Sequence, residues 1–360
     1  MSIALDLARA SYRGISLYSP DRTPCAIDLS DNTNLWGVPP GAARAVREAF
    51  ASSITRYPPL YATALKEALA GYLGVPGDMI VTGCGSDDVL DSAIRAFAEP
   101  GDMIAFPDPS FAMIPIFARM NGLETAPIPL EDGRDIDADA MLATQARIIY
   151  LCSPNNPTST ALDISAIERI VERAPGLVIL DEAYAEFATR NGLSLLERSE
   201  RLLITRTMSK AFGLAGLRIG YAAGAPALVA EVEKSRGPYK VNALAERAAM
   251  TALGEDLPWV RDRVAELQAN RARLAAELTA LGLEPMESSA NFCFVPTSRA
   301  DELARGLRTV GIAVRPFTDL PSSIARFHDT SGAALRITVG PWEMMEPLLD
   351  VLATLTGIRR

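Results

Sequence analysis

Short apolar runs alternate with amphipathic stretches through the middle of this 360-residue chain, and this alternation most restricts its fold. Each run is bounded by Gly, Pro, Asn or Asp, as strands commonly are. Stretches between them, such as 86–98 and 164–174, carry apolar residues at helical spacing. This order predicts an α/β fold with a mainly parallel sheet that helices cover on both faces. The runs are MIVTG (79–83), MIAF (103–106), RIIYLC (147–152), LVILD (177–181), RLLITRT (201–207) and LRIGYAA (217–223).

The pattern divides the chain into three parts. Residues 1–40 hold four prolines and little helical periodicity, and we expect an extended N-terminal arm there. Residues 41–250 carry the alternating pattern and form the predicted large domain. In residues 251–360, a long helix ends at Gly282 and is followed by shorter strands and helices. We expect this last part to be a small α+β domain.

Charge and composition exclude several classes of function. Lys and Arg number 35 against 44 Asp and Glu, and the net charge of −9 disfavours binding to nucleic acid or to an anionic membrane. No apolar run approaches the roughly 20 residues of a membrane span, so we expect a cytoplasmic protein. The four cysteines lie far apart and His328 is the only histidine, which disfavours metal sites, disulfides and histidine-based catalysis.

Lysine is rare in this chain. Arginine cannot form an imine, so covalent amine chemistry requires Lys66, Lys210, Lys234 or Lys240. The position of Lys66 is typical of a solvated helix face, and Lys234 and Lys240 are expected to carry helix-end charges. Lys210 follows the run 201–207 among small residues and glycines, where burial lowers a lysine pKa enough for nucleophilic chemistry.

Ligands of an open parallel sheet bind beyond the carboxyl ends of its strands. The run 79–83 is followed by Cys84-Gly85-Ser86-Asp87-Asp88, which opens a helix and offers N–H groups and a hydroxyl to an anion such as phosphate. An ordinary N-cap by Ser86 or Asp87 is the alternative. Asp181 ends a buried run, where a carboxylate needs a cationic partner or else caps the next helix.

One cofactor requires an anion seat, an imine-forming lysine, a buried carboxylate and an Asn/Tyr pair together. That cofactor is pyridoxal 5'-phosphate (PLP), whose ring accepts electrons when its pyridine nitrogen stays protonated. Lys210, Asp181, Asn156 and Tyr184 supply the required side chains, and Arg218 can bind the phosphate. These features together predict a PLP site.

Several segments of the chain resemble class I/II aminotransferases of the fold type I PLP superfamily, most nearly the histidinol-phosphate aminotransferase branch. The segments are PNNPTST, LVILDEAY, SKAFGLAGLRIGY, RGPYKVN and LRITVG. The resemblance extends from about Tyr18 to the C-terminus. It implies a large PLP-binding domain, a small C-terminal domain and a homodimer.

The resemblance also implies roles for individual residues. Lys210 would be the Schiff-base lysine and proton shuttle, Asp181 the pyridinium partner, and Asn156 and Tyr184 donors to the ring hydroxyl. The cofactor phosphate would be held by Gly85, Ser86, Ser209 and Arg218, with Asp87 beside them. Phe111 would stack on the cofactor ring, and Tyr57 would reach the cofactor phosphate of the partner subunit. The substrate would be bound by Tyr18, Arg315 and Arg336.

Two segments depart from the family pattern. The usual Asn-Glu-Asn-Pro segment is replaced by Asn32-Thr33-Asn34-Leu35, and the usual Pro-Thr-Gly by Pro157-Thr158-Ser159. The arm helps to build the substrate pocket in this family, so these departures bear on substrate choice.

We therefore expect a ping-pong aminotransferase that works through the pyridoxamine form on histidinol phosphate and 2-oxoglutarate, in histidine biosynthesis. An aromatic amino-acid aminotransferase is the alternative within the same chemistry. A phosphothreonine-type PLP decarboxylase and a ligand-sensing regulator domain are further alternatives. The acidic chain shows neither a helix-turn-helix nor the basic stretch that a DNA-binding regulator requires.

Overall fold

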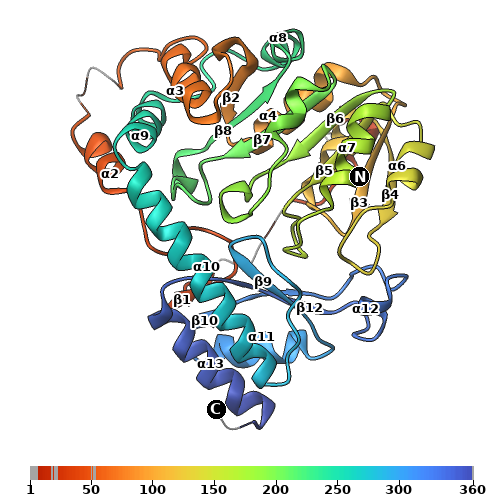
Figure 1. Cartoon of the computed structure of the whole chain (residues 1–360), viewed down its shortest axis with the longest axis vertical. Helices are drawn as coiled ribbons and strands as arrows, with labels where there is room; N and C mark the ends of the chain where they lie inside the picture. The colour runs from red at the N-terminus through yellow and green to blue at the C-terminus, as the bar shows by residue number, and fades with distance from the viewer. Residues whose placement is uncertain (1–6, 18, 20–22, 50, 52–53, 359–360) are drawn as a thin grey trace.

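The computed structural model describes residues 7–17, 19, 23–49, 51 and 54–358. The central sheet of this part of the chain has seven strands in the order β2-β8-β7-β6-β5-β3-β4 (Figure 1). Its strands are β2 (Ile80–Cys84), β3 (Met103–Asp108), β4 (Glu124–Pro129), β5 (Ile148–Cys152), β6 (Leu177–Asp181), β7 (Leu202–Thr207) and β8 (Ile219–Gly224). β8 runs antiparallel to both of its neighbours, and the other strands are parallel to one another. The predicted α/β fold is confirmed.

The central strands are buried along their whole length, which explains why their sequences are continuous apolar runs. Alternate residues of β5 face opposite sides of the sheet. Ile149 and Leu151 pack with α6 (Ala138–Ala143) and α7 (Ile164–Arg173). Ile148 and Tyr150 pack with α4 (Ser86–Phe97), α5 (Met113–Asn121) and α8 (Pro226–Ser235). Helices thus cover both faces of the sheet.

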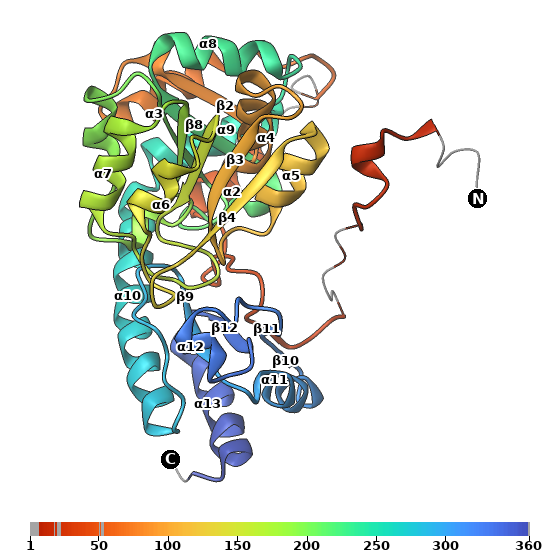
Figure 2. The ribbon, with the colours of Figure 1, turned by 90° about the vertical axis from the view of Figure 1, so that its right-hand side faces the viewer.

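Further helices extend this part of the molecule. α2 (Pro40–Arg47), α3 (Thr63–Leu73) and α9 (Ala243–Gly254) pack together beside β2 and β8. α10 (Leu257–Ala280) runs from them toward the C-terminal part (Figures 1 and 2). It ends before Gly282, whose φ of 72° suits a glycine at a helix C-terminus, as the sequence predicted.

The C-terminal part contains an antiparallel sheet of order β11-β12-β9, backed by α11 and α13. The N-terminal segment joins this part, because β1 pairs in parallel with β10. The elements are β1 (Ile27–Asp28), β9 (Phe292–Pro296), α11 (Ala300–Thr309), β10 (Ile312–Ala313), β11 (Arg315–Phe317), α12 (Ala325–His328), β12 (Ala334–Thr338) and α13 (Trp342–Thr356). Short 3-10 turns are η1 (Ala10–Tyr12), η3 (Gly77–Met79), η4 (Ala185–Phe187), η5 (Leu193–Glu197) and η6 (Ala215–Leu217).

The structure differs from the sequence expectation in three elements. β4, ETAPIP, was not expected, because its two prolines disfavour a strand. It is an edge strand, and each of its residues is partly or fully exposed. The run IAVRPF was expected as one strand and is divided into β10 and β11 by Val314. β1 has only two residues, too few for a periodic signal.

The described part of the arm before β1 extends away from the body of the molecule in Figure 2, whereas β1 and the residues after it are part of the body. It contacts α5, where Arg119 Nη1 donates to the Gly14 carbonyl oxygen over 2.8 Å. In the described ranges no helix is long and apolar enough to cross a membrane.

Candidate active site

A cavity of about 550 Å³ lies at the carboxyl ends of β5, β6 and β7 and is closed on one side by β11 and β12. This is the position that an open α/β sheet offers to ligands. The predicted site residues on its wall are Ser86, Asp87, Phe111, Asn156, Asp181, Tyr184, Ser209, Lys210, Arg218, Arg315 and Arg336. Gly85 lies directly behind this wall, beside Arg218.

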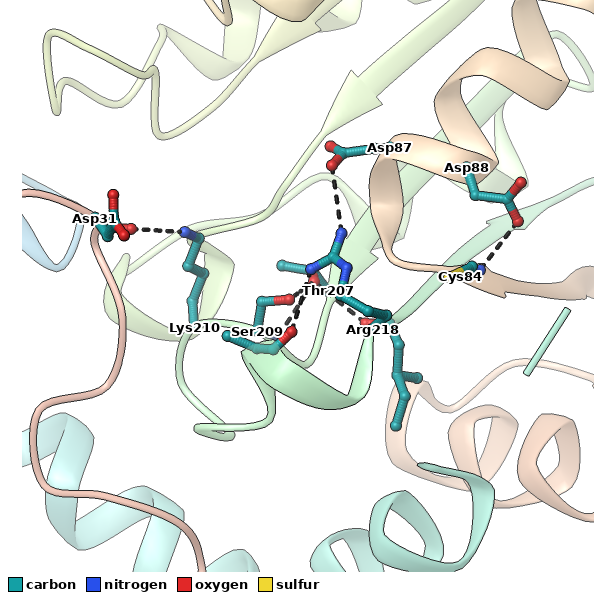
Figure 3. A network of polar contacts seen from close by, with 10 residues as sticks. Asp31, Cys84, Asp87, Asp88, Thr207, Ser209, Lys210 and Arg218 are labelled. Atoms are coloured by element: carbon teal, nitrogen blue, oxygen red, sulfur yellow. Dashed lines mark hydrogen bonds and ion pairs between the residues drawn. The ribbon is translucent and has the colours of Figure 1, made fainter. Parts of the chain in front are cut away.

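Lys210 follows β7 on a turn whose neighbouring residues Met208, Ala211 and Phe212 are anchored in the core. Its amine lies 3.4 Å from the Asp31 carbonyl oxygen (Figure 3). Within the described ranges it forms no ion pair with a carboxylate. Burial, followed by the positive charge of Arg336, lowers the pKa of Lys210 to about 8. Roughly a tenth of this amine is therefore neutral and nucleophilic at pH 7, far more than of a lysine with its ordinary pKa.

Asp181 ends β6 and is buried. Its Oδ2 accepts a hydrogen bond from the Tyr150 hydroxyl at 2.8 Å, and its Oδ1 accepts one from the Thr205 hydroxyl at 3.0 Å. Burial raises the pKa of Asp181 to about 6, while the two hydroxyl donors act in the opposite direction. No Lys or Arg of the described chain lies within ion-pair distance of it. The predicted cationic partner is thus not a side chain. Asp181 does not cap the next helical turn either, because the N-cap of η4 is Tyr184 and no side chain caps it.

The glycine-rich turn after β2 forms a cradle for an anion. Gly85 has a φ of 82°, and a Cβ there would overlap the Arg218 guanidinium. Arg218 Nη2 lies 3.3 Å from Asp87 Oδ2 (Figure 3). The Ser209 hydroxyl lies 2.9 Å from the Thr207 hydroxyl, on the same cavity wall. The Arg218 guanidinium and two hydroxyls therefore share the cavity wall with the N-terminus of α4.

The alternative in which Ser86 or Asp87 caps α4 is wrong. The N-cap residue is Gly85, and no side chain caps the helix. The neighbouring carboxylate, Asp88, accepts the Cys84 N–H over 3.0 Å instead (Figure 3). The first N–H groups of α4 are thus left to a ligand or to water.

Tyr184 and Asn156 lie on the cavity wall beside Arg336. The Asn156 Oδ1 accepts a hydrogen bond from Arg336 Nη1 at 2.6 Å, which leaves the Asn156 amide group available as a donor. Tyr184 is buried, and burial raises its pKa to about 12. Its hydroxyl is therefore protonated and able to donate at neutral pH.

Arg315 and Arg336 lie directly opposite each other on the antiparallel strands β11 and β12, and both line the cavity. Arg336 also lies 5.5 Å from the Phe292 ring and 5.7 Å from the Phe317 ring. Arg315 has no carboxylate partner among the described residues. Like charges at opposed positions destabilise a sheet, so this wall is suited to an anionic ligand.

Besides Gly85, Tyr57 is the predicted site residue of the described ranges that does not line the cavity. Tyr57 is 83% exposed and stacks on Tyr239 with ring centroids 4.7 Å apart. Tyr18 lies outside the described residues.

The remaining lysines form ion pairs. Lys66 pairs with Glu233 at 2.5 Å with both side chains largely buried, so its predicted solvated position is wrong. Lys240 pairs with Asp88 of α4 at 2.8 Å and does not carry the predicted charge at the end of α8. Lys234 lies in the last turn of α8, as expected.

Sequence analysis missed several residues that shape the site. Thr205 and Tyr150 bind Asp181 from the neighbouring strands, and only the sheet order reveals them. Gly220 on β8 is required because a Cβ would overlap the Ser86 backbone nitrogen. Asn32, noted only within a divergent segment, donates to the Tyr184 hydroxyl. For Tyr150, Thr205 and Gly220 the sequence signal is a polar or small residue within an apolar run, whereas Asn32 lies in a polar segment and has no such signal.

Comparison with known proteins agrees with this geometry. The family profile "Aminotransferase class I and II" matches residues 25–352. The chain belongs to the class I and II aminotransferases. It is a PLP-dependent enzyme, which confirms the predicted family, activity and cofactor.

Three relatives illustrate the relationship. The chain is 32% identical to a histidinol-phosphate aminotransferase of Thermoanaerobacter sp. (strain X514), over 97% of this chain and 99% of that protein. It is 34% identical to an aromatic amino acid aminotransferase of Streptomyces coelicolor, over 95% and 96% of the two chains. The structure of a histidinol-phosphate aminotransferase from Sinorhizobium meliloti in complex with PLP superposes with a TM-score of 0.82 at 26% identity, covering 92% of both chains.

The cavity of this aminotransferase fits PLP on three observations. Lys210 presents an amine without a carboxylate partner, and Asp181 presents a buried carboxylate without a cationic one, within the chain as described. The cradle at Gly85 would be filled by any Cβ. An aldehyde, a pyridinium and a phosphate are the three groups that such a donor set complements.

Proposed function

We propose that this aminotransferase transfers the amino group of L-histidinol phosphate to 2-oxoglutarate by a ping-pong route. The observation that supports it most is the opposed pair Arg315 and Arg336 on the cavity wall. Histidinol phosphate has no α-carboxylate, so its phosphate is the group that these arginines would bind. The planar guanidinium suits this role, because it gives two charge-assisted hydrogen bonds to one phosphate.

Four side chains would act on the cofactor. When bound, PLP supplies the electron-accepting ring and carries the amino group between the two substrates. Lys210 would bind it covalently and move the proton at the substrate carbon, which its lowered pKa favours. Asp181 would hold the proton on the pyridine nitrogen. Asn156 and Tyr184 would donate hydrogen bonds to the ring oxygen.

The anion cradle would hold the cofactor phosphate. Gly85 allows the close backbone approach, and Ser86, Ser209 and Arg218 supply donors. Asp87 pairs with Arg218 and would keep its guanidinium oriented. Phe111 lies on the cavity wall, where its ring would stack on that of the cofactor.

The test is an assay of the purified protein with histidinol phosphate, phenylalanine, tyrosine and glutamate as donors. Arg315→Lys keeps the charge and removes the planar fork, so kcat/KM for histidinol phosphate should fall by roughly tenfold or more. Turnover of phenylalanine should change less. Absence of any reaction with histidinol phosphate contradicts the proposal.

Aromatic amino-acid transamination is the second candidate, because the Streptomyces relative carries that name and the cavity contains Phe111 and Phe317. Rapid turnover of phenylalanine or tyrosine without histidinol phosphate would support it. Release of carbon dioxide in place of amino transfer would instead indicate a phosphothreonine-type decarboxylase.

We also propose a homodimer, with Tyr57 directed to the cofactor phosphate of the partner. Tyr57 is an exposed large apolar side chain that stacks on another, Tyr239, and Ile54, Leu60 and Tyr61 of the same segment are exposed as well. A second copy of the chain would cover these side chains. A cytoplasmic location, without membrane or nucleic-acid partners, stays a prediction.

A further inference from the structure

Asn32 occupies a constrained position between the two parts of the molecule. It is 1% exposed and has a φ of 55°, a conformation that asparagine tolerates better than most residues. Its backbone N–H donates to the Thr338 hydroxyl of β12 at 3.0 Å, and its side-chain amide donates to the Tyr184 hydroxyl at 3.1 Å. Asn291 holds its carbonyl oxygen over 3.0 Å.

These contacts determine the direction of a chain of hydrogen bonds. Because the Thr338 oxygen accepts the Asn32 N–H, its own proton is directed to Asn32 Oδ1, 3.2 Å away. The Asn32 oxygen therefore faces Thr338, and its NH₂ group faces Tyr184. The Tyr184 oxygen accepts this hydrogen bond from Asn32, so the hydroxyl proton of Tyr184 does not point toward Asn32. Because Tyr184 lines the cavity, this proton is directed into the cavity.

We propose that Asn32 is a positioning residue that makes the Tyr184 hydroxyl a donor toward the cofactor, and that Thr338 sets the orientation of the Asn32 amide. This inference rests on the proposed role of Tyr184 as a donor to the ring oxygen. The inference also assigns a function to the divergent segment 32–35, because this segment supplies the asparagine that orients the Tyr184 hydroxyl.

The same segment also contacts the substrate-binding wall. Arg336 Nη2 donates to the Ser30 carbonyl oxygen at 2.8 Å, and Arg336 lies on β12, two positions from Thr338. One strand of the small sheet thus fixes both the arginine proposed to bind substrate and the residue that directs Tyr184.

The decisive variant is Asn32→Gly. Glycine adopts the positive φ without strain, so this change removes the side chain and spares the backbone. The readout is a pH titration of the visible absorption of the PLP-loaded protein. A donor to the ring oxygen stabilises its negative charge and disfavours protonation of the adjacent nitrogen. We expect the titration midpoint of Asn32→Gly to rise by roughly half to one pH unit.

Two substitutions of Thr338 test the direction of these hydrogen bonds. Thr338→Val removes the hydroxyl that orients Asn32 and should raise the titration midpoint. Thr338→Ser keeps the hydroxyl, so its midpoint should equal that of the unmodified protein. Asn32→Gly should cause no additional shift in a Tyr184→Phe background, because Asn32 acts through that hydroxyl. The charged or titratable groups near Tyr184 are Arg336, Cys152, Asp181 and Lys210, and all of them stay unchanged.

Ser30→Ala is the matched structural control. It removes the hydrogen bond of 2.6 Å from Ser30 to Asp28 in the same segment and should leave the midpoint unchanged. An unshifted midpoint in Asn32→Gly, an equal shift in Ser30→Ala, or a further shift in the Tyr184→Phe background would overturn the inference. If Tyr184→Phe alone leaves the midpoint unchanged, the proposed role of Tyr184 itself is wrong.

Discussion

Lys210 and Asp181 face one cavity with opposite charges, yet neither forms an ion pair with a side chain of the described ranges. Burial therefore works against the charged form of each residue, lowering one pKa and raising the other. At the scale of single residues, the protein holds two groups ready for a ligand that complements both.

The lowered pKa of Lys210 predicts its reactivity in the cofactor-free protein. Acetic anhydride acylates only the neutral amine, so labelling of the peptide containing Lys210 should rise with pH around a midpoint of about 8. Free lysine, labelled in parallel and measured by mass spectrometry, provides the reference. A midpoint equal to that of free lysine contradicts the prediction.

Borohydride reduction of the PLP-loaded protein tests the covalent attachment. The pyridoxyl mass should be found on the Lys210 peptide, because Lys210 is the lysine on the cavity wall. Lys210→Arg keeps the charge and should abolish turnover, since guanidinium cannot form the bond. Label on the peptide of Lys66, Lys234 or Lys240 would refute the assignment.

Asp181→Asn should act in opposite directions on stability and on catalysis. The folded state holds the Asp181 proton more tightly than the unfolded chain, so this group's stabilising effect is lost as pH rises toward about 6. The loss amounts to at most roughly 1.4 kcal/mol per pH unit. The cofactor-free Asn variant should lack this slope in chemical denaturation, while the loaded variant loses turnover by orders of magnitude. Near-normal turnover would mean that Asp181 is only structural.

At the scale of elements, the anion cradle depends on two segments that approach closely, the turn after β2 and the strand β8. Gly83 and Gly220 are paired across these antiparallel strands. Gly85 and Ser86 lie over Gly220, leaving no space for a side chain. The position of the α4 N-terminus is therefore set by how closely these backbones approach.

Gly220→Ala tests this approach. The added methyl group would force the Ser86 backbone outward, costing on the order of 1–3 kcal/mol of stability and weakening PLP binding. Isothermal titration of the cofactor-free variant with PLP measures the loss. Gly216→Ala is the control, because no atom lies within 4 Å of the Cβ that it adds. Equal PLP affinity in both variants would contradict the prediction.

At the scale of the whole molecule, the N-terminal segment contacts both the part that holds the central sheet and the C-terminal part. β1 pairs with β10 in the C-terminal part, and Asn34 donates to the Ala211 carbonyl oxygen, next to Lys210. We propose that this segment, a large domain over 41–250 and a small domain over 251–360 form the three structural units of the chain.

Subunit complementation tests the proposed dimer. A Lys210→Ala protein mixed with a Tyr57→Phe protein should form heterodimers in which one of the two sites has both native residues. After free exchange, about a quarter of the sites are native, so a comparable share of activity should return. Each variant alone, treated in the same way, is the control. A fully active monomer by light scattering would refute shared sites.

The sequence by itself determined the fold class, the family and the chemically decisive residues. These follow from local information: buried strands read as continuous apolar runs, few lysines are present, and Asp181 ends such a run. The approximate limits of α4, α7 and α10 are likewise set by helical periodicity, because each is encoded within about three to seven turns of chain.

The tertiary structure alone decided which distant residues act together. Asn32 and Tyr184 are 152 positions apart, and Asn32 and Thr338 are 306 apart, so no local pattern reports their contact. The antiparallel direction of β8, the register that opposes Arg315 to Arg336, and the buried pairing of Lys66 also depend on packing between separate elements. Periodicity shows which face of an element is buried, but the partner across that face is chosen only when the whole chain folds.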